Sequence, residues 1–325
     1  MAEWRRLEAD DVRAILQSFG RPPTAAYRAH RPIAVGTINT NVRVETEAGL
    51  WFLRINEGKS LDDVAREAAI VSHVAAHGVP TPPPLRSPAG QPFVLWRDQI
   101  VSLFPWVPGR TLTRDEVTPA QATAVGHALA QLHRAGAAFS DRRSGRYEPD
   151  EIGRRLAHIT ALARPELAAA LAVLAPELDR LSTERASGLP MGLIHGDLFI
   201  DNVLYTDDGA LAALIDFEQA SWGRLAYDLA VTVLAFAFGR DDFRPDLVRA
   251  LLDAYAAVRP PTDAERAAFP AELRFAACRF AITRITDVHL KQGTGAAPGK
   301  RYQRYLDRLA RLKDHLASGD RLLSL

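Results

Sequence analysis

Residues 193–218 read LIHGDLFIDNVLYTDDGALAALIDFE, and the polar residues of this stretch recur at a spacing that is typical of one chemistry. Asn202 follows Asp197 by five positions, and Asp216 follows Asn202 by fourteen. This spacing matches the phosphoryl-transfer template, in which one aspartate accepts the proton of a substrate hydroxyl while an asparagine and a second aspartate hold magnesium on the phosphates of ATP. Such a transfer requires divalent cations, hard oxygen ligands for them and a carboxylate aligned with the attacking oxygen.

The surroundings of this motif predict a small sheet with high negative charge. A turn at 207–209 separates the last two of three apolar runs that favour short strands, at 193–194, 203–205 and 211–215. Residues 191–230 contain seven acids and one base, Arg224, which leaves a net charge of −6. Carboxylates at this density are stable when partly buried only if cations accompany them.

Outward from the motif, the first part of the chain is rich in strand signals. Period-two alternation over residues 33–56 predicts a β-hairpin that turns at 48–49. Ser60, followed three positions later by Asp63, predicts the capping box of a helix. Two more strands are predicted by the apolar runs at 93–96 and 100–104.

The second part of the chain is mostly helical by pattern. Thr118, Pro119 and Gln121 predict the start of one helix, and further helical periodicity covers residues 150–185 and 225–320. The prolines and glycine of residues 105–109 predict the boundary between the two parts. We therefore expect an α+β chain of two lobes, one over residues 1–105 with an antiparallel sheet and a mainly helical one over residues 106–325.

Composition excludes several classes of protein. The 325 residues carry 40 Lys+Arg and 39 Asp+Glu, so the chain has no global field that would hold a polyanion such as nucleic acid or a membrane surface. Its single cysteine, Cys278, forms neither an internal disulfide nor a cysteine metal site. The longest apolar run, residues 229–238, is too short to span a bilayer. We expect a cytoplasmic protein whose partner is a small molecule.

Several segments resemble a known family of enzymes. Residues 195–204, 226–230 and 279–284 are similar to the aminoglycoside-phosphotransferase/choline-kinase group, small-molecule kinases with a protein-kinase-like fold, and the first of these segments looks most like the homoserine kinases of that superfamily. The resemblance implies a bilobal kinase that uses ATP and Mg²⁺. It further implies phosphorylation of a hydroxyl, with homoserine converted to O-phosphohomoserine for threonine biosynthesis.

The same resemblance implies roles for the residues of the motif. Asp197 is the expected catalytic base, and Asn202 and Asp216 are the expected magnesium ligands. His195 and Asp228 are expected to be structural, with Asp228 accepting hydrogen bonds from loop backbone. The remaining carboxylate of the loop, Asp201, is open to two interpretations, a substrate contact or a brace of the loop.

The first lobe is expected to bind the nucleotide, although its motifs are irregular. Arg54 takes the place of the expected phosphate-pairing lysine, with Glu67 as its ion-pair partner; an exposed strand arginine is the alternative. Gly58-Lys59-Ser60 mimics the end of a Walker A loop, but that motif needs a glycine at position 53. This chain has Leu53 there, so we reject the motif. The other predicted nucleotide contacts are a phosphate-covering turn and a segment between the lobes: Gly36, Thr37, Asn39, Phe104, Trp106 and Val107.

The charge distribution bears on the phosphate acceptor. Residues 271–325 carry eleven bases and five acids, which disfavours a polycationic aminoglycoside. Helical spacing places Arg284 where it could bind a substrate carboxylate and Asp287 where it could bind an ammonium group, unless the two form a surface pair. Glu218 and Trp222 are further expected substrate contacts. Alternatives that stay open are a choline/ethanolamine or aminoglycoside-type kinase and a nucleotide-binding pseudokinase; the oligomeric state is not indicated by the sequence.

Overall fold

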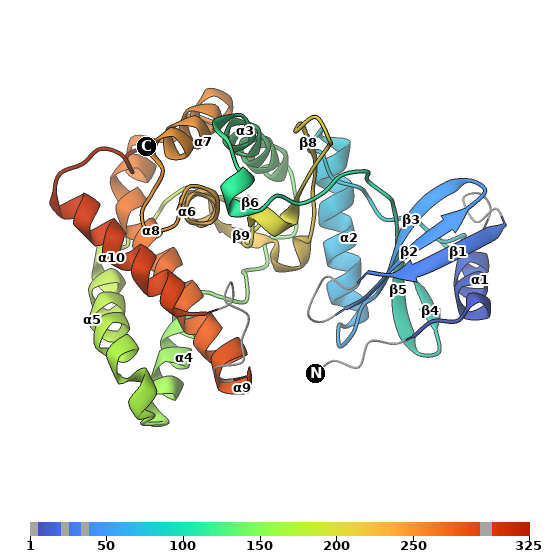
Figure 1. Ribbon diagram of the computed structural model, residues 1–325, viewed down its shortest axis with the longest axis horizontal. Helices are drawn as coiled ribbons and strands as arrows, with labels where there is room; N and C mark the ends of the chain where they lie inside the picture. Colours follow the sequence, from blue (N-terminus) through green and yellow to red (C-terminus); the bar gives the residue numbers. More distant parts are fainter. Residues whose placement is uncertain (1–5, 21–25, 34–38, 293–300) are drawn as a thin grey trace. The chain divides into compact units, whose positions relative to one another are not determined.

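The computed structural model describes residues 6–20, 26–33, 39–292 and 301–325 (Figure 1). The chain forms two compact units, of which the first comprises Met1–Arg110 and Ala212–Glu218 and the second comprises Thr111–Leu211 and Gln219–Leu325. The break after Arg110 is close to the predicted boundary at residue 105. The segment Ala212–Glu218 joins the first unit, whereas the sequence-based division placed it in the second.

An antiparallel sheet organises the first unit. The sheet has the strand order β1-β2-β3-β5-β4, and its strands are β1 (Tyr27–Pro32), β2 (Thr40–Thr46), β3 (Gly49–Ile55), β4 (Val94–Trp96) and β5 (Gln99–Pro105). The β2–β3 hairpin and the β4–β5 hairpin are the two that the sequence predicts, whereas β1 carries no clear alternation and was not expected. The turn between β4 and β5 places Arg97 and Asp98 at φ 46° and 62°, the left-handed geometry of a tight hairpin.

Alternation along the strands gives this sheet one apolar face. Val42 and Val44 of β2 and Leu53 and Ile55 of β3 are buried in one cluster with residues of helix α1 (Ala9–Ser18). The opposite face is polar and aromatic, with Phe52 and Arg54 of β3 paired in register with Phe104 and Ser102 of β5. Side chains that alternate along a strand point to opposite faces, so this second face is free of the apolar core.

Helix α2 (Leu61–Ala76) completes the first unit. Ser60 accepts a hydrogen bond from the Asp63 N–H at 3.1 Å, and the Asp63 carboxylate accepts one from the Ser60 N–H at 3.1 Å. This reciprocal capping box is the one predicted from the sequence. It fixes the start of the helix and so places Glu67, which lies on the second turn.

The second unit is helical. Its elements are α3 (Pro119–Gly136), α4 (Pro149–Ala161), α5 (Ala168–Glu184), α6 (Leu225–Phe236), α7 (Pro245–Val258), α8 (Asp263–Arg284), a π-helical stretch at Ile285–His289, α9 (Leu290–Gln292) and α10 (Gln303–Ala317). Every residue of α6 is buried, and Figure 1 shows this helix almost end-on in the middle of the second unit. The predicted capping box of α3 is present, with Pro119 at its first position.

Short strands accompany the helices near the motif. Strands β6 (Met191–Ile194) and β9 (Ser221–Arg224) pair with each other, while β7 (Val203–Tyr205) and β8 (Leu211–Leu214) flank the turn predicted at 207–209. The α+β class expected from the sequence is confirmed. Within the described ranges, no helix is both long and apolar enough to cross a membrane.

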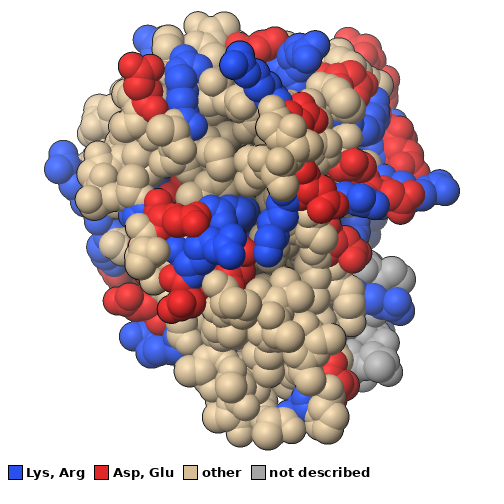
Figure 2. Space-filling view, turned by 90° about the vertical axis from the view of Figure 1, so that its left-hand side faces the viewer, with Lys and Arg blue, Asp and Glu red and all other residues tan. Residues whose placement is uncertain are grey.

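Ion pairs between distant segments change the charge distribution inferred from the sequence. Arg274 binds Glu177 at 2.8 Å, and Lys313 binds the same carboxylate at 3.2 Å, so part of the basic final quarter is neutralised by α5. Figure 2 shows one face of the molecule, on which acidic and basic side chains are interspersed and basic side chains gather near the middle. Net charge along a sequence segment therefore does not equal net charge at the surface it forms.

Contact between α3 and α7 depends on a glycine, which gives a test of the packing. A Cβ on Gly126 would lie 2.2 Å from the carbonyl oxygen of Leu251, whereas a Cβ on Gly153 of α4 would meet no atom within 4 Å. We expect Gly126→Ala to lower the free energy of unfolding by about 1–3 kcal/mol, measured by urea denaturation. The matched change Gly153→Ala should raise it by about 0.5–1 kcal/mol, and equal effects would contradict this packing.

Candidate active site

The buried carboxylate of Asp228 holds the loop that carries the motif. Its Oδ2 accepts hydrogen bonds from the backbone N–H of His195 at 2.8 Å and from His133 Nε2 at 3.0 Å, and its Oδ1 accepts one from the Gly196 N–H at 2.8 Å. Burial favours a higher pKa, but the bond to His133, its charge and the backbone N–H of Gly196 outweigh this and lower the pKa of Asp228. The structural contact predicted for Asp228 is thus present.

Gly196 sets the direction of the loop. It adopts φ 75°, and a Cβ at this position would lie 2.9 Å from the carbonyl oxygen of Gln219. Asn202 closes the loop, because its Nδ2 donates a hydrogen bond to the carbonyl oxygen of Asp197 at 2.8 Å. This bond leaves Oδ1, a hard oxygen ligand, as the remaining polar atom of the Asn202 side chain.

Arg279 of α8 approaches the carboxylate of Asp197. Its Nη1 lies 3.7 Å from Asp197 Oδ1, and its buried guanidinium lies 4.0 Å from the ring centroid of Tyr147 and 3.7 Å from that of Phe280. Burial raises the pKa of Asp197, while the positive charge of Arg279 opposes that rise. Sequence reasoning noted Arg279 only for its helical spacing from Arg284, and no sequence signal linked it to Asp197.

The cavity next to Arg279 is positively charged. The 145–149 segment, β6, β9, α6 and α8 line it, with Gly196, Gln219 and Tyr147 among the lining residues. Arg185 and Arg224 also line it and bind the fully buried carboxylate of Glu272 at 2.6 Å and 2.7 Å. The whole cavity belongs to the second unit. Trp222 is not among the lining residues; its ring packs under Arg142 instead.

The first unit contains a second group of interacting charges. Arg54 Nη2 lies 2.8 Å from Glu67 Oε1, which is the ion pair expected from the sequence. Lys59 Nζ lies 3.2 Å from Glu67 Oε2 and 2.7 Å from Glu218 Oε2. Burial acts against the charge of Arg54, but Glu67, Asp216 and Glu218 more than compensate and raise the pKa of its guanidinium.

Lys59 is a residue that the sequence reasoning missed as part of this site. Rejecting the Walker A motif from the sequence agrees with the structure. Lys59 precedes α2 and binds two carboxylates, and it is not part of a glycine-rich loop. A signal did exist, because Lys59 is the only lysine before residue 291 of the sequence. Glu218, expected to contact the substrate, instead pairs with Lys59.

Aromatic side chains surround Arg54 on the polar face of the sheet. Its guanidinium lies 5.2 Å from the ring centroid of Phe104, which packs on Phe52 at 5.9 Å. Trp106 lies under Arg43 at 5.5 Å. Among the other predicted nucleotide contacts, Val107 is half-buried, Asn39 has a buried Oδ1 with no hydrogen-bond partner among the described residues, and Gly36 and Thr37 lie outside the described residues.

Asp216 lies in a strained backbone conformation in the first unit. Its φ of 66° is in the left-handed region, which a non-glycine residue adopts at an energetic cost. Strain of this kind concentrates at functional sites, where the surrounding structure enforces it. Its charge contributes to the raised pKa of Arg54, so the two side chains share one electrostatic environment.

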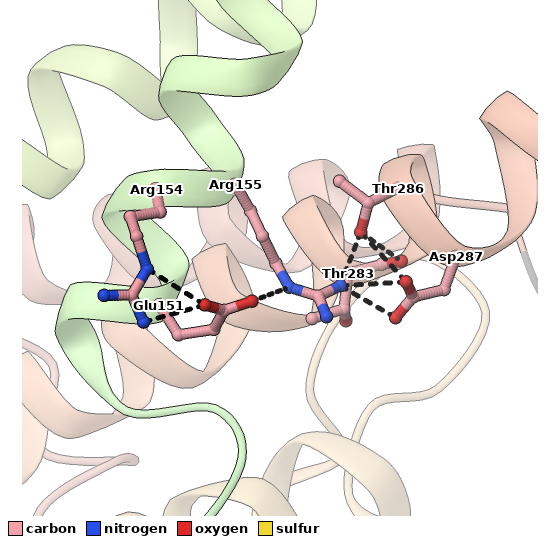
Figure 3. A network of polar contacts seen from close by, with 6 residues as sticks. All are labelled: Glu151, Arg154, Arg155, Thr283, Thr286 and Asp287. Atoms are coloured by element: carbon pink, nitrogen blue, oxygen red, sulfur yellow. Dashed lines mark hydrogen bonds and ion pairs between the residues drawn. The ribbon is translucent and has the colours of Figure 1, made fainter.

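The residues expected to bind an amino-acid substrate are only partly available for that role. Both carboxylate oxygens of Asp287 accept hydrogen bonds from Arg155 Nη1, at 2.8 and 2.9 Å, and Arg155 is also held by Glu151 and Thr286 (Figure 3). This internal network engages both carboxylate oxygens of Asp287 with a cation of the chain itself, and the assignment of Asp287 to a substrate ammonium group stays a prediction. Arg155 could not be anticipated, since it lies on α4, far from Asp287 in sequence.

Two other predicted substrate residues, Arg284 and Asp201, are at least partly exposed to solvent. Arg284 is half-buried at the end of α8, with its guanidinium 5.0 Å from the ring centroid of Tyr305. Asp201 is exposed in the 3-10 turn Ile200–Asn202. The charges of both act on Asp197, that of Asp201 raising and that of Arg284 lowering its pKa. All three therefore lie in one region of the second unit.

Solved structures with the same architecture show the class of fold. A spectinomycin phosphotransferase in complex with ADP and spectinomycin matches with a TM-score of 0.69 at 14% identity, covering 95% of this chain and 98% of that one. A choline/ethanolamine kinase family protein from Mesorhizobium loti matches with a TM-score of 0.64 at 20% identity, covering 94% and 93%. The chain thus has the protein-kinase-like fold of small-molecule phosphotransferases.

Sequence comparison then gives the family. The chain belongs to the phosphotransferase enzyme family, whose family model matches residues 29–269. It is 33% identical to a homoserine kinase of Methylobacillus glycogenes over 298 residues, or 90% of each chain. It is also 33% identical to a homoserine kinase of Granulibacter bethesdensis over 322 residues, or 98% of each chain. The family expected from the motif is confirmed.

Asp228 can be tested as the anchor of the loop. Asp228→Asn would turn an amide N–H₂ toward backbone N–H donors, so we expect the free energy of unfolding at pH 7 to fall by about 2–4 kcal/mol in urea titrations. Asp253→Asn, an exposed carboxylate on α7, is the matched control and should change it by less than about 0.5 kcal/mol.

The effect should also depend on pH. The lowered folded-state pKa of Asp228 means that its stabilisation is complete above the unfolded pKa of about 4 and is lost as the pH falls through the folded value. The difference between the natural protein and Asp228→Asn should therefore shrink on acidification. A difference that stays constant down to the acid transition would contradict the anchoring role.

Proposed function

We propose that this phosphotransferase transfers the γ-phosphoryl group of ATP to the hydroxyl of homoserine, giving O-phosphohomoserine and ADP. The observation that carries the proposal is the placement of Asp197, on a loop held by Asp228 and beside Arg279, in a chain similar to homoserine kinases over nearly its whole length. In this step the substrate oxygen bonds to the γ-phosphorus, the bond to the β,γ-bridging oxygen breaks, and Asp197 accepts the hydroxyl proton.

The nucleotide would bind mainly to the first unit. Arg54 and Lys59, both oriented by Glu67, would contact phosphate oxygens, and the face formed by Phe104 and Trp106, with the backbone of Val107, would receive the adenine. A magnesium ion, if bound, would supply neutralising charge on the phosphates. Asn202 and Asp216 would hold it, which fits the enforced backbone of Asp216 and the Oδ1 of Asn202, which has no hydrogen bond to any residue that the structure describes.

The acceptor would bind in the second unit. Arg284 would pair with the substrate carboxylate and Asp201 with its ammonium group, in place of Asp287, which is engaged by Arg155. The charges of Arg284 and Asp201 both act on Asp197, which supports a place for them around a small acceptor. We place the reaction in the cytoplasm.

The aromatic pair beside Asp197 argues against a choline-type acceptor. A quaternary ammonium group is bound by faces of aromatic rings. The rings of Tyr147 and Phe280 are already covered by the guanidinium of Arg279. The positive cavity next to them similarly disfavours a polycationic aminoglycoside.

A coupled ADP-release assay across homoserine, choline, ethanolamine and an aminoglycoside tests the proposal. We expect homoserine to give the highest kcat/KM, and Asp197→Asn to lower kcat by about 10²–10⁴-fold because the general base is lost. The control is Asp207→Asn, an exposed turn residue, which should retain activity. Turnover of another acceptor above homoserine would refute the substrate, and near-full activity of Asp197→Asn would refute the mechanism.

Arg279 should set the pH at which Asp197 becomes active. Because burial raises the pKa of Asp197 and Arg279 opposes the rise, Arg279→Gln should shift the acidic limb of kcat/KM to higher pH. Arg279→Lys keeps the charge and should shift it less. An unchanged pH profile in Arg279→Gln would assign Arg279 a packing role only.

A further inference from the structure

A charged cavity of about 310 Å³ lies in the second unit among residues that have no role in the proposed reaction. The 3-10 turn Arg114–Glu116, the first turns of α10 and the segment after α6 enclose it. Its charged lining consists of four arginines and two aspartates: Arg114, Arg240, Arg304, Arg308, Asp115 and Asp307. The lining therefore carries a formal excess of two positive charges.

Arg308 is the most deeply buried of these side chains, with 2% of its surface exposed. Its Nε donates to the carbonyl oxygen of Leu234 at 3.0 Å, and its Nη1 donates to that of Arg304 at 2.9 Å. The guanidinium also packs against the rings of Phe238 and Tyr305, both at 4.7 Å. All of these partners are neutral groups.

Other buried arginines of the chain are neutralised by carboxylates. Arg54 binds Glu67 at 2.8 Å, and Arg185 binds Glu272 at 2.6 Å. Within the part of the chain that the structure describes, neither Arg308 nor Arg114 has a carboxylate at ion-pair distance, and Arg114 Nη1 donates to the Gly239 carbonyl at 3.1 Å. A buried charge without a counter-charge is costly, so an anion in this cavity would be stabilised.

The electrostatics of the cluster support the same conclusion. Burial, together with the charges of Arg114, Arg304 and Arg284, lowers the pKa of Arg308 to about 9. Burial and Arg304 lower the pKa of Arg114 to about 10. Both guanidinium groups stay charged at pH 7, and they repel one another.

We propose that this cavity is a binding site for a phosphate-type oxyanion, held by Arg114, Arg304 and Arg308 together. Guanidinium groups match the oxygens of phosphate in charge and geometry. A single carboxylate needs only one such group, whereas the several phosphate oxygens can each meet a different arginine. The same chemistry is offered by inorganic phosphate and by a phosphomonoester. Its lining residues include none of the expected nucleotide contacts, and the proposal does not depend on the proposed function.

The test is a binding measurement on the full chain with its nucleotide site filled by a non-hydrolysable ATP analogue. Sodium phosphate is titrated against sodium chloride at equal ionic strength, by calorimetry and by the melting temperature. We expect phosphate to bind with a dissociation constant at or below the millimolar range and to raise the melting temperature, because a ligand that binds only the folded state stabilises it.

Variants of the lining decide whether binding occurs here. Arg304→Gln and Arg114→Gln, both half-buried in the natural protein, should weaken phosphate binding at least about tenfold, since each removes a charged hydrogen bond. Arg301→Gln, an exposed arginine just before α10 that does not line the cavity, is the matched control and should stay within about twofold. Circular dichroism confirms that each variant is folded, and the half-buried positions keep the test valid if Arg308→Met fails to fold.

Two further ligands separate the sources of the anion. O-phosphohomoserine that binds at least tenfold more tightly than inorganic phosphate would identify a phosphomonoester, and equal affinity would identify free phosphate. Homoserine, which carries the carboxylate alone, should not compete. Absence of phosphate binding at 10 mM, unchanged affinity in Arg304→Gln and Arg114→Gln, or competition by homoserine as strong as by phosphate would overturn the proposal.

Discussion

The arrangement of the second unit depends on the hydrogen bonds that the buried carboxylate of Asp228 accepts. A charge removed from water is tolerated only when hydrogen bonds replace its hydration, and here three donors do so. Two donors are backbone N–H groups of the loop, and the third is His133 of α3, which in turn contacts Tyr255 of α7 at 2.7 Å. One side chain on α6 therefore couples the loop to two more helices, and a loop placed elsewhere would leave the charge with His133 alone.

Paired charges have a similar organising role in the first unit. Glu67 receives Arg54 from β3 and Lys59 from the segment before α2, so a single carboxylate fixes the positions of two cations. Glu218 holds the other side of Lys59. In the proposed reaction, N–H donors of Arg54 and Lys59 that the carboxylates do not use would contact phosphate oxygens. A single lysine at the position of Arg54 would provide one positive charge, whereas this chain provides two, on Arg54 and Lys59.

Local signals in the sequence were sufficient for much of the fold. The capping boxes at Ser60 and Thr118, the β2–β3 and β4–β5 hairpins and the strands around the motif follow from patterns within a few residues, and all of them are present. Strand β1 was missed because its residues show no alternation; its position depends on pairing with β2. The ion pair between Asp287 and Arg155 was also missed, because helical spacing on one element says nothing about a side chain on another.

Spacing along the chain was enough to predict the class of fold, the family and the motif residues Asp197, Asn202 and Asp216. Which charges meet depends instead on how the chain folds. Arg279 lies beside Asp197, Lys59 pairs with Glu218, and Arg308 donates to the carbonyl of Leu234 with no carboxylate near it among the described residues; each contact joins segments that are remote in sequence. The physical reason is that a charge interacts over a few ångströms of space, and folding sets those distances through the packing of the whole core.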